Sequence, residues 1–120
     1  MVFIDVNKVK EIIEKDIKEG LIPFFLGLTI GGTGLGATDP ITEIVKITKE
    51  YNMFVNVDAA WAGTAFYVPE LRQELEGLKH VDSIMMNYGK WGMGGMPGAM
   101  MFVADRDKLI ESMEGKAPKP

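Results

Sequence analysis

Apolar residues recur at helical spacing near the start of the chain, between Asn7 and Glu19, with lysine and glutamate on the opposite face. The apolar positions are Val9, Ile12, Ile13 and Ile17. This pattern predicts an amphipathic helix that stops at Gly20, because glycine readily takes the backbone conformation that ends a helix. The apolar run 21–30 is short and continuous, which predicts a buried strand, and Pro23 is tolerated near its start.

The middle of the chain repeats this alternation of helix and strand. A glycine-rich loop, 31–38, precedes Asp39–Pro40, a capping residue followed by proline, which predicts a helix that ends near Tyr51. The apolar run 53–57 predicts a second strand, terminated at Asp58.

The second half of the chain is expected to contain a helix, two strands and a final helix. Their expected places are 69–75, 81–87, 99–103 and the stretch from the capping residue Asp105 to about Met113. A second glycine-rich loop, closed by 93–97, separates the two strands, and 115–120 form a polar tail.

The order of these elements predicts the fold class. Strands that alternate with helices indicate an α/β domain with a mostly parallel sheet and flanking helices. The connection 88–98 is too short to hold a crossover helix, so the last strand is expected to run antiparallel to its neighbour.

Composition narrows the class of protein. The chain has 120 residues, 47% of them hydrophobic, and a net charge of −4, as expected of one globular domain or a piece of a larger one. The sequence lacks the concentrated basic patch that is typical of nucleic-acid-binding proteins, so no nucleic-acid partner is expected. It also has no apolar stretch of the roughly 20 residues that a membrane-spanning helix needs. The absence of cysteine and the single His80, expected to be exposed, argue against disulfides and multi-histidine metal sites. Without a signal-peptide pattern at the N-terminus, we expect a cytoplasmic protein.

Polar or glycine-rich residues follow three of the predicted strands, at 31–38, 58–64 and 87–95. Ligands of open α/β sheets bind at the carboxyl ends of strands, so these loops are expected to converge on one rim. Asp58 and Lys90 are then the charged pair expected at a shared pocket.

Each member of that pair has two interpretations. Asp58 either caps the turn that follows its strand, or is an acid beside a flat ligand that Ala59 and Ala60 allow to approach. Lys90 is either an ordinary surface charge or a partly buried amine, whose pKa burial lowers and whose nucleophilicity suits Schiff-base chemistry.

A weaker pattern points to a different ligand. Gly32-x-Gly34-x-x-Ala37, with Asp58 about 20 residues beyond it, matches a loose nicotinamide-dinucleotide fingerprint. Asp39–Pro40 delays the helix until after the motif, whereas a dinucleotide-binding helix begins inside it.

Other residues are expected to pack in the core or an interface: the aromatic Trp61, Phe66 and Tyr67, and the methionines between Met85 and Met101.

Several motifs follow one another in a consistent order and spacing. They are 20–25, 29–33, the run Asn56-Val57-Asp58-Ala59-Ala60-Trp61-Ala62-Gly63-Thr64-Ala65-Phe66, Pro69-Glu70-Leu71-Arg72, 81–84 and Asn87-Tyr88-Gly89-Lys90-Trp91. Together, from about Val6 to Met113, they resemble the group II pyridoxal-phosphate-dependent decarboxylases, and most closely the aromatic-L-amino-acid branch.

This resemblance implies a fold type I large domain and a carboxy-lyase that converts an L-amino acid, expected to be aromatic, to an amine and carbon dioxide. Lys90 would hold pyridoxal 5′-phosphate as an internal aldimine, and Asp58 would pair with its pyridinium nitrogen. Ala60 would pack on one face of the ring, Asn87 would sit near the phosphate, and Thr33 would lie close to the cofactor. The family also implies a homodimer.

Two departures from the family pattern matter. Tyr88 and Gly89 stand where the family motif Asn-Pro-His-Lys-Trp has proline and histidine. By the resemblance, residues 1–120 correspond to the central part of the family's large domain. We therefore expect this domain to be truncated at both ends in the present chain. The alternative to an active decarboxylase is therefore a truncated or degenerate, non-catalytic family member.

Overall fold

A computed structural model describes residues 4–95 and 98–115 of the chain. Its elements are α1 (Val6–Lys18), β1 (Phe25–Thr29), α2 (Ile41–Glu50), β2 (Phe54–Ala59), the 3-10 segments η1 (Gly63–Tyr67) and η2 (Pro69–His80), β3 (Ser83–Asn87), β4 (Ala99–Val103) and α3 (Arg106–Met113). Each helix and strand predicted from the sequence is present with ends that differ by a few residues, except that a 3-10 segment takes the place of the helix expected over 69–75.

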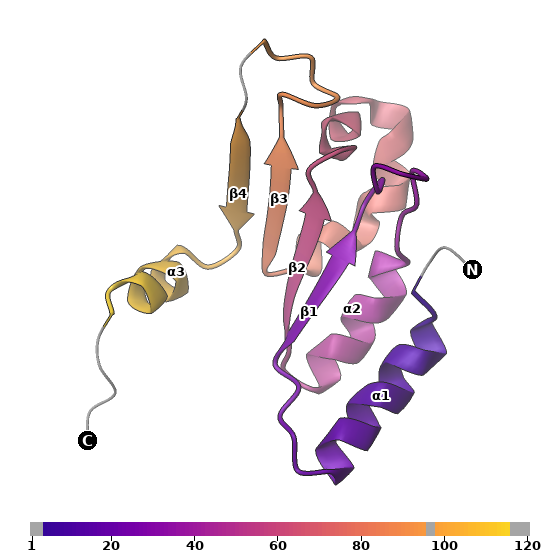
Figure 1. Cartoon of the computed structure of the whole chain (residues 1–120), viewed down its shortest axis with the longest axis vertical. Coiled ribbons are helices and arrows are strands. Elements are labelled where there is room, and N and C mark those ends of the chain that lie inside the picture. The colour runs from indigo at the N-terminus through magenta and orange to yellow at the C-terminus, as the bar shows by residue number, and fades with distance from the viewer. Residues whose placement is uncertain (1–3, 96–97, 116–120) are drawn as a thin grey trace.

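The strands form one four-stranded sheet in the order β1-β2-β3-β4 (Figure 1). β1, β2 and β3 are parallel, and β4 is antiparallel to β3. The predicted α/β class and the antiparallel last strand are therefore confirmed. β2 continues through Asp58 to Ala59, so the prediction that the strand stops at Asp58 is wrong by that short extension.

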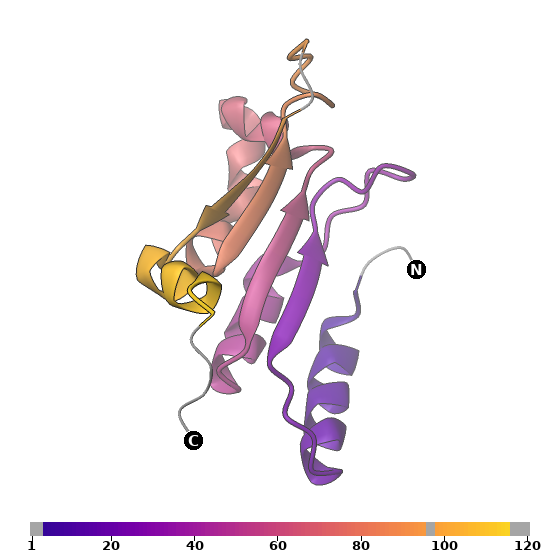
Figure 2. The ribbon, with the colours of Figure 1, turned by 60° about the vertical axis from the view of Figure 1, so that its left-hand side comes forward.

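One face of the sheet carries the core. Alternate residues of β1 and β2, such as Leu28, Val55 and Val57, are buried against α2, whose Ile44 is fully buried as well. Figure 2 shows α2 and the 3-10 segments on the same side of the sheet. Every second side chain of the strands points to this face, and the apolar side chains of α2 recur at helical spacing on one side of the helix, so the two elements pack together in this layer.

The opposite face of the sheet is largely open over β1 and β2. Register pairs Phe25 with Phe54 there, and their rings stack with centroids 6.1 Å apart, although both side chains remain about half exposed. α3 lies beyond the carboxyl end of β4 in both views (Figures 1 and 2). A cavity of about 390 Å³ lies between α3 and this face, lined by Phe54, Met101 and Leu109 among others.

Two carboxylates hold backbone amides of the sheet. Asp39 accepts hydrogen bonds from the amides of Ile4 (3.1 Å) and Thr29 (2.8 Å), and Asp82 accepts one from Val55 (2.7 Å). The prediction that Asp39 caps α2 is wrong, because Pro40 occupies the capping position and no side chain caps the helix. The carboxylate instead fastens the segment before α1 to the end of β1.

The stretch after β2 departs most from the expected structure. The helix expected over 69–75 is a 3-10 helix that continues to His80, and η1 was not predicted. Gly77 lies so close to α2 that a Cβ there would meet the Thr42 amide nitrogen at 2.7 Å. Such a close approach between backbones depends on the tertiary packing and leaves no hydrophobic period in the sequence.

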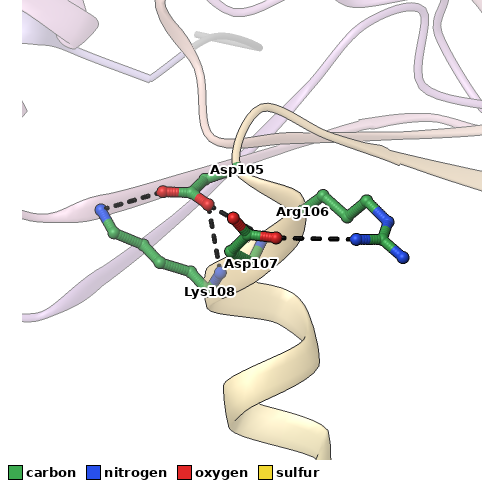
Figure 3. A network of polar contacts seen from close by, with 4 residues as sticks. All are labelled: Asp105, Arg106, Asp107 and Lys108. Carbon is green, nitrogen blue, oxygen red and sulfur yellow. Dashed lines mark hydrogen bonds and ion pairs between the residues drawn. The ribbon is translucent and has the colours of Figure 1, made fainter.

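The ends of α1 and α3 follow the sequence closely. Gly20 has the left-handed φ of +82° expected after α1, and Asp105 caps α3 by accepting from the amides of Asp107 and Lys108, both at 3.1 Å (Figure 3). Exposed ion pairs join Lys108 to Asp105 and Arg106 to Asp107. Of the predicted polar tail, 115–120, residues 116–120 lie outside the described residues.

Packing contradicts one further prediction. Met86 is buried, but Met93, Met100 and Met101 are exposed, so the methionine-rich segment is not simply core. The reason is topological: Met100 faces the side of the edge strand β4 that the helical layer does not reach, Met101 lies on the opposite, open face, and Met93 lies in the loop before β4. Met96 lies outside the described residues. None of the helices that the structure describes has the length and hydropathy needed to cross a membrane.

Candidate functional site at the carboxyl ends of the strands

The three loops expected to converge do so. A pocket of about 150 Å³ is lined by residues of the loop after β1, the loop after β2 and the loop after β3. They include Gly31, Gly36 and Thr38 from the first loop, Trp61, Ala62 and Phe66 from the second, and Trp91 from the third. Trp61 and Phe66 also pack against the core, as predicted. The carboxyl ends of the parallel strands thus share one rim.

Gly31 brings the first two loops into contact. Its φ is +61°, and a Cβ on this residue would lie 2.1 Å from the Cβ of Ala62. Only glycine fits both the conformation and the space. This contact sets the position of the loop after β1 relative to the end of β2.

Asp58 projects from β2 on the open face of the sheet. Its register partners are Thr29 in β1 and Met85 in β3. One carboxylate oxygen, Oδ1, accepts a hydrogen bond from the Ala60 amide at 2.9 Å, so the turn-capping interpretation is confirmed. Within residues 4–95 and 98–115, Oδ2 accepts no hydrogen bond and the carboxylate forms no ion pair. The exposed side chain therefore keeps an acceptor available to a ligand.

The small residues around Asp58 differ in exposure. Ala60 is buried directly after β2, whereas Thr33 is exposed in the loop after β1. The loop around Thr33 uses its own amides, because Gly32 donates to the Ala37 carbonyl (2.9 Å) and Gly36 donates to the Gly32 carbonyl (2.7 Å).

The same loop bears on the dinucleotide alternative. α2 begins at Ile41, after the glycine motif, as the sequence predicted. The fingerprint needs a helix N-terminus inside the motif to meet the pyrophosphate. The loop geometry therefore does not favour a nicotinamide cofactor here.

Lys90 lies in the loop that follows β3. Asn87, the last residue of β3, turns the chain there by accepting a hydrogen bond from the Gly89 amide (2.8 Å) at its side-chain oxygen. Lys90 itself is exposed, so the alternative of a partly buried amine is wrong for this structure. Because β3 neighbours β2, Lys90 and Asp58 come from adjacent strands at the same end of the sheet, but neither lines the pocket between the three loops, so the prediction that the pair faces this shared pocket is wrong.

Sequence reasoning missed a pair of tyrosines at this rim. The hydroxyl groups of Tyr67 and Tyr88 are hydrogen-bonded, and the ring centroids are 6.2 Å apart. Tyr67 is exposed at the end of η1, and Tyr88 directly follows β3. Since the two residues lie 21 positions apart, no local pattern indicates that they meet.

Comparison with known proteins places this geometry in a family context. The family model described as "Pyridoxal-dependent decarboxylase conserved domain" matches residues 2–117. Tryptophan decarboxylase 2 of Oryza sativa subsp. japonica is 40% identical over 105 residues, which cover 88% of this chain and 21% of that protein.

Solved structures give the same picture. The 4-hydroxyphenylacetaldehyde synthase of Rhodiola rosea is 37% identical, with a TM-score of 0.87 over 91% of this chain and 23% of that one. Oryza sativa TDC with PLP and tryptamine is 33% identical, with a TM-score of 0.88 over 96% of this chain and 24% of that one. The chain thus spans between a fifth and a quarter of the length of these relatives.

Proposed function

Because the chain belongs to the pyridoxal-dependent decarboxylase family and has the corresponding fold type I topology, we propose that it is the central part of the large domain of an amino-acid decarboxylase. In this proposal the complete protein is a carboxy-lyase that releases carbon dioxide from an L-amino acid and yields the amine. The observation that carries the proposal is the placement of Asp58 and Lys90 at the carboxyl ends of two adjacent parallel strands.

The chemistry of these side chains fits the cofactor of the family. A pyridinium nitrogen needs a carboxylate acceptor, and Asp58 has an oxygen without a hydrogen bond among the described residues. An aldehyde needs a primary amine, which the exposed Lys90 offers from the neighbouring loop. The open face of the sheet leaves Asp58 accessible to a flat ring.

We assign the binding roles accordingly. Lys90 holds pyridoxal 5′-phosphate covalently through Nζ, and Asp58 holds the proton on the ring nitrogen. Ala60 would contact one face of the ring, Asn87 would lie near the phosphate, and Thr33 would lie close to the cofactor.

The bound cofactor supplies an electron sink for the charge left when the carboxyl group departs. Asp58 makes that sink effective because a carboxylate next to the ring nitrogen favours its protonated form. The hydrogen bond from the Ala60 amide fixes Oδ1, so the carboxylate is oriented before the cofactor binds.

We propose an aromatic amino acid as the substrate and a homodimer as the assembly. The support for the substrate comes from relatives described as tryptophan decarboxylase and tyrosine decarboxylase, at 40% and 41% identity. The homodimer, the cytoplasmic location and the absence of a nucleic-acid partner stay predictions from the sequence.

The test is to titrate the chain with pyridoxal 5′-phosphate, record its visible absorption, reduce it with borohydride and map the labelled peptide. We expect a saturable band and a label on Lys90. Asp58→Asn should weaken cofactor binding about 10- to 100-fold, because a charge-assisted hydrogen bond is lost. Asp107→Asn, which alters an exposed carboxylate on α3, serves as the matched control.

A label scattered over surface lysines such as Lys8 and Lys46, with no saturable band, would contradict the proposed site. Carbon dioxide release from tyrosine, tryptophan and glutamate then tests the reaction. Amine formation that survives Lys90→Ala unchanged would contradict the proposed mechanism.

A second candidate is a non-catalytic family member. Gly89 favours it, because this position offers no side chain next to Lys90, and so does the exposure of Gly89 and Lys90. This candidate predicts a folded chain that binds the cofactor weakly or not at all and releases no carbon dioxide. The same titration distinguishes it from the decarboxylase.

A further inference from the structure

The loop that carries Lys90 is held mainly by bonds within itself. Tyr88 donates its amide to the Gly98 carbonyl, Gly94 donates to the Tyr88 carbonyl at 3.1 Å, and Met93 donates to the Lys90 carbonyl at 3.3 Å. Several glycines give this loop much conformational freedom, and part of that freedom is lost when Lys90 is held in one position. A contact from outside the loop would therefore have a large effect on where Lys90 sits.

Among the hydrogen bonds of the described residues 88–95, those of the Gly89 and Lys90 amides reach Asn87 at the end of β3, and one reaches an element distant in the sequence, because it joins the Tyr88 hydroxyl to the Tyr67 hydroxyl. The rings lie at 36° to each other with centroids 6.2 Å apart, so the pair makes a ring contact as well as a polar one. Gly92 adds a steric contact on the same side, since a Cβ there would meet Thr64 Cγ2 at 2.9 Å.

Tyr67 has a firm base for this contact. The Arg72 guanidinium donates to the carbonyl of Phe66 (2.8 Å) and to that of Tyr67 (3.5 Å), which fixes the end of η1. Gly63, the first residue of η1, packs against Met86 of β3, where a Cβ would come within 2.9 Å. η1 is thus anchored to the same strand from which the Lys90 loop departs.

The protonation of the pair agrees with a persistent bond. The hydrogen bond to Tyr67, followed by partial desolvation, raises the pKa of the Tyr88 hydroxyl above its usual value of 10.0. The Tyr88 hydroxyl therefore stays protonated at neutral pH, and one hydroxyl of the pair can donate to the other.

We propose that Tyr67 and Tyr88 act as positioning residues, whose contact (the tyrosine clasp) holds the Lys90 loop against η1 and so presents Lys90 Nζ at the cofactor site. This inference rests on the proposed function for the role of Lys90. Gly89, between Tyr88 and Lys90, has no side chain that could restrain the loop. The tyrosine clasp supplies that restraint from one residue further back.

The first arm of the test needs no cofactor. Hydrogen–deuterium exchange of the loop amides 88–95 is compared between the unchanged chain, Tyr67→Phe, Tyr88→Phe and the double variant. Each variant keeps both rings and removes the hydroxyl contact, so exchange should rise about three- to ten-fold, the effect of one net hydrogen bond. The double variant should match the single ones, because either substitution alone removes the bond.

The second arm measures what positioning does. Pyridoxal 5′-phosphate and borohydride are applied to each variant, and the label on Lys90 is compared with that on Lys46. The ratio should fall about three- to ten-fold in both phenylalanine variants, while the urea midpoint stays within error. Tyr51→Phe is the matched control, since it removes a tyrosine hydroxyl bond to Glu14 (3.3 Å) between α1 and α2.

The outcomes separate the two proposals. Unchanged exchange in both phenylalanine variants, or an unchanged labelling ratio with a labelled Lys90, overturns the tyrosine clasp. An unlabelled Lys90 in the unchanged chain overturns the proposed function, and the exchange arm then still decides whether the clasp holds the loop.

Discussion

Gly31→Ala probes the contact that brings the site loops together. The new Cβ would lie 2.1 Å from the Ala62 Cβ, far inside van der Waals contact, and the backbone φ of +61° is unfavourable for alanine. The left-handed conformation costs about 1–2 kcal/mol, and the overlap costs about 1–3 kcal/mol more once neighbours shift. We therefore expect a loss of about 2–5 kcal/mol in the free energy of unfolding, a large part of a typical domain's stability.

Two companion variants separate the two costs. Gly36→Ala has the same kind of backbone, with φ +64°, but open space around its Cβ, so it should lose only the conformational part, about 1–2 kcal/mol. Adding Ala62→Gly to Gly31→Ala removes the overlapping methyl group and should restore most of the steric part.

Urea unfolding followed by tryptophan fluorescence measures these differences. With a urea dependence of about 1–3 kcal/mol per molar, Gly31→Ala should lower the midpoint by roughly 1–3 M. Equal midpoints for Gly31→Ala and Gly36→Ala would refute the reasoning, because the steric contact with Ala62 would then contribute nothing. No recovery in the Gly31→Ala/Ala62→Gly double variant would refute it as well.

Three further variants test other parts of the fold by the same unfolding assay. Asp39→Ala should cost about 1–3 kcal/mol, since it leaves two part-buried amides without their acceptor, whereas Asp39→Asn should lose less. Ile44→Ala, at a fully buried position, should cost about 2–5 kcal/mol, and the half-exposed Ile12→Ala much less. Hydrogen bonds from the Lys108 and Asp107 amides lower the pKa of Asp105. The ionised carboxylate therefore stabilises the folded chain at pH values above the ordinary pKa of 3.8, and this stabilisation is lost as the pH falls through the lowered pKa of the folded chain. Asp105→Asn should remove that part of the loss of stability below the ordinary pKa of 3.8, and an unchanged acid dependence of unfolding would contradict the role of the cap.

Local pattern was sufficient for the elements and their order. Helical spacing in α1 and α2 and short apolar runs in the strands depend only on neighbours along the chain, and so do the stops and caps at Gly20 and Asp105. Chain length also settled the direction of β4, because ten or so residues cannot hold a crossover helix. The converging loops then followed from the rule for parallel sheets, and Asp58 and Lys90 fell at that rim.

Other features depended on which groups the fold brings within reach. Asp39 looked like a helix cap because the sequence shows only its neighbours, yet the assembled sheet offers it the amide of Ile4, 35 residues away, and that of Thr29. The exposure of Met100 depends on the helical layer ending before the edge strand, which no run of residues encodes. The meeting of Tyr67 and Tyr88 arises only when η1 packs against β3. Sequence alone therefore determined the α-helices, the strands and the residues at the rim, but not the 3-10 segments after β2, because the former depend on short-range periodicity and steric preference. Tertiary structure decided their partners and exposure, because hydrogen bonds and burial form between whichever groups the packing of distant segments brings together.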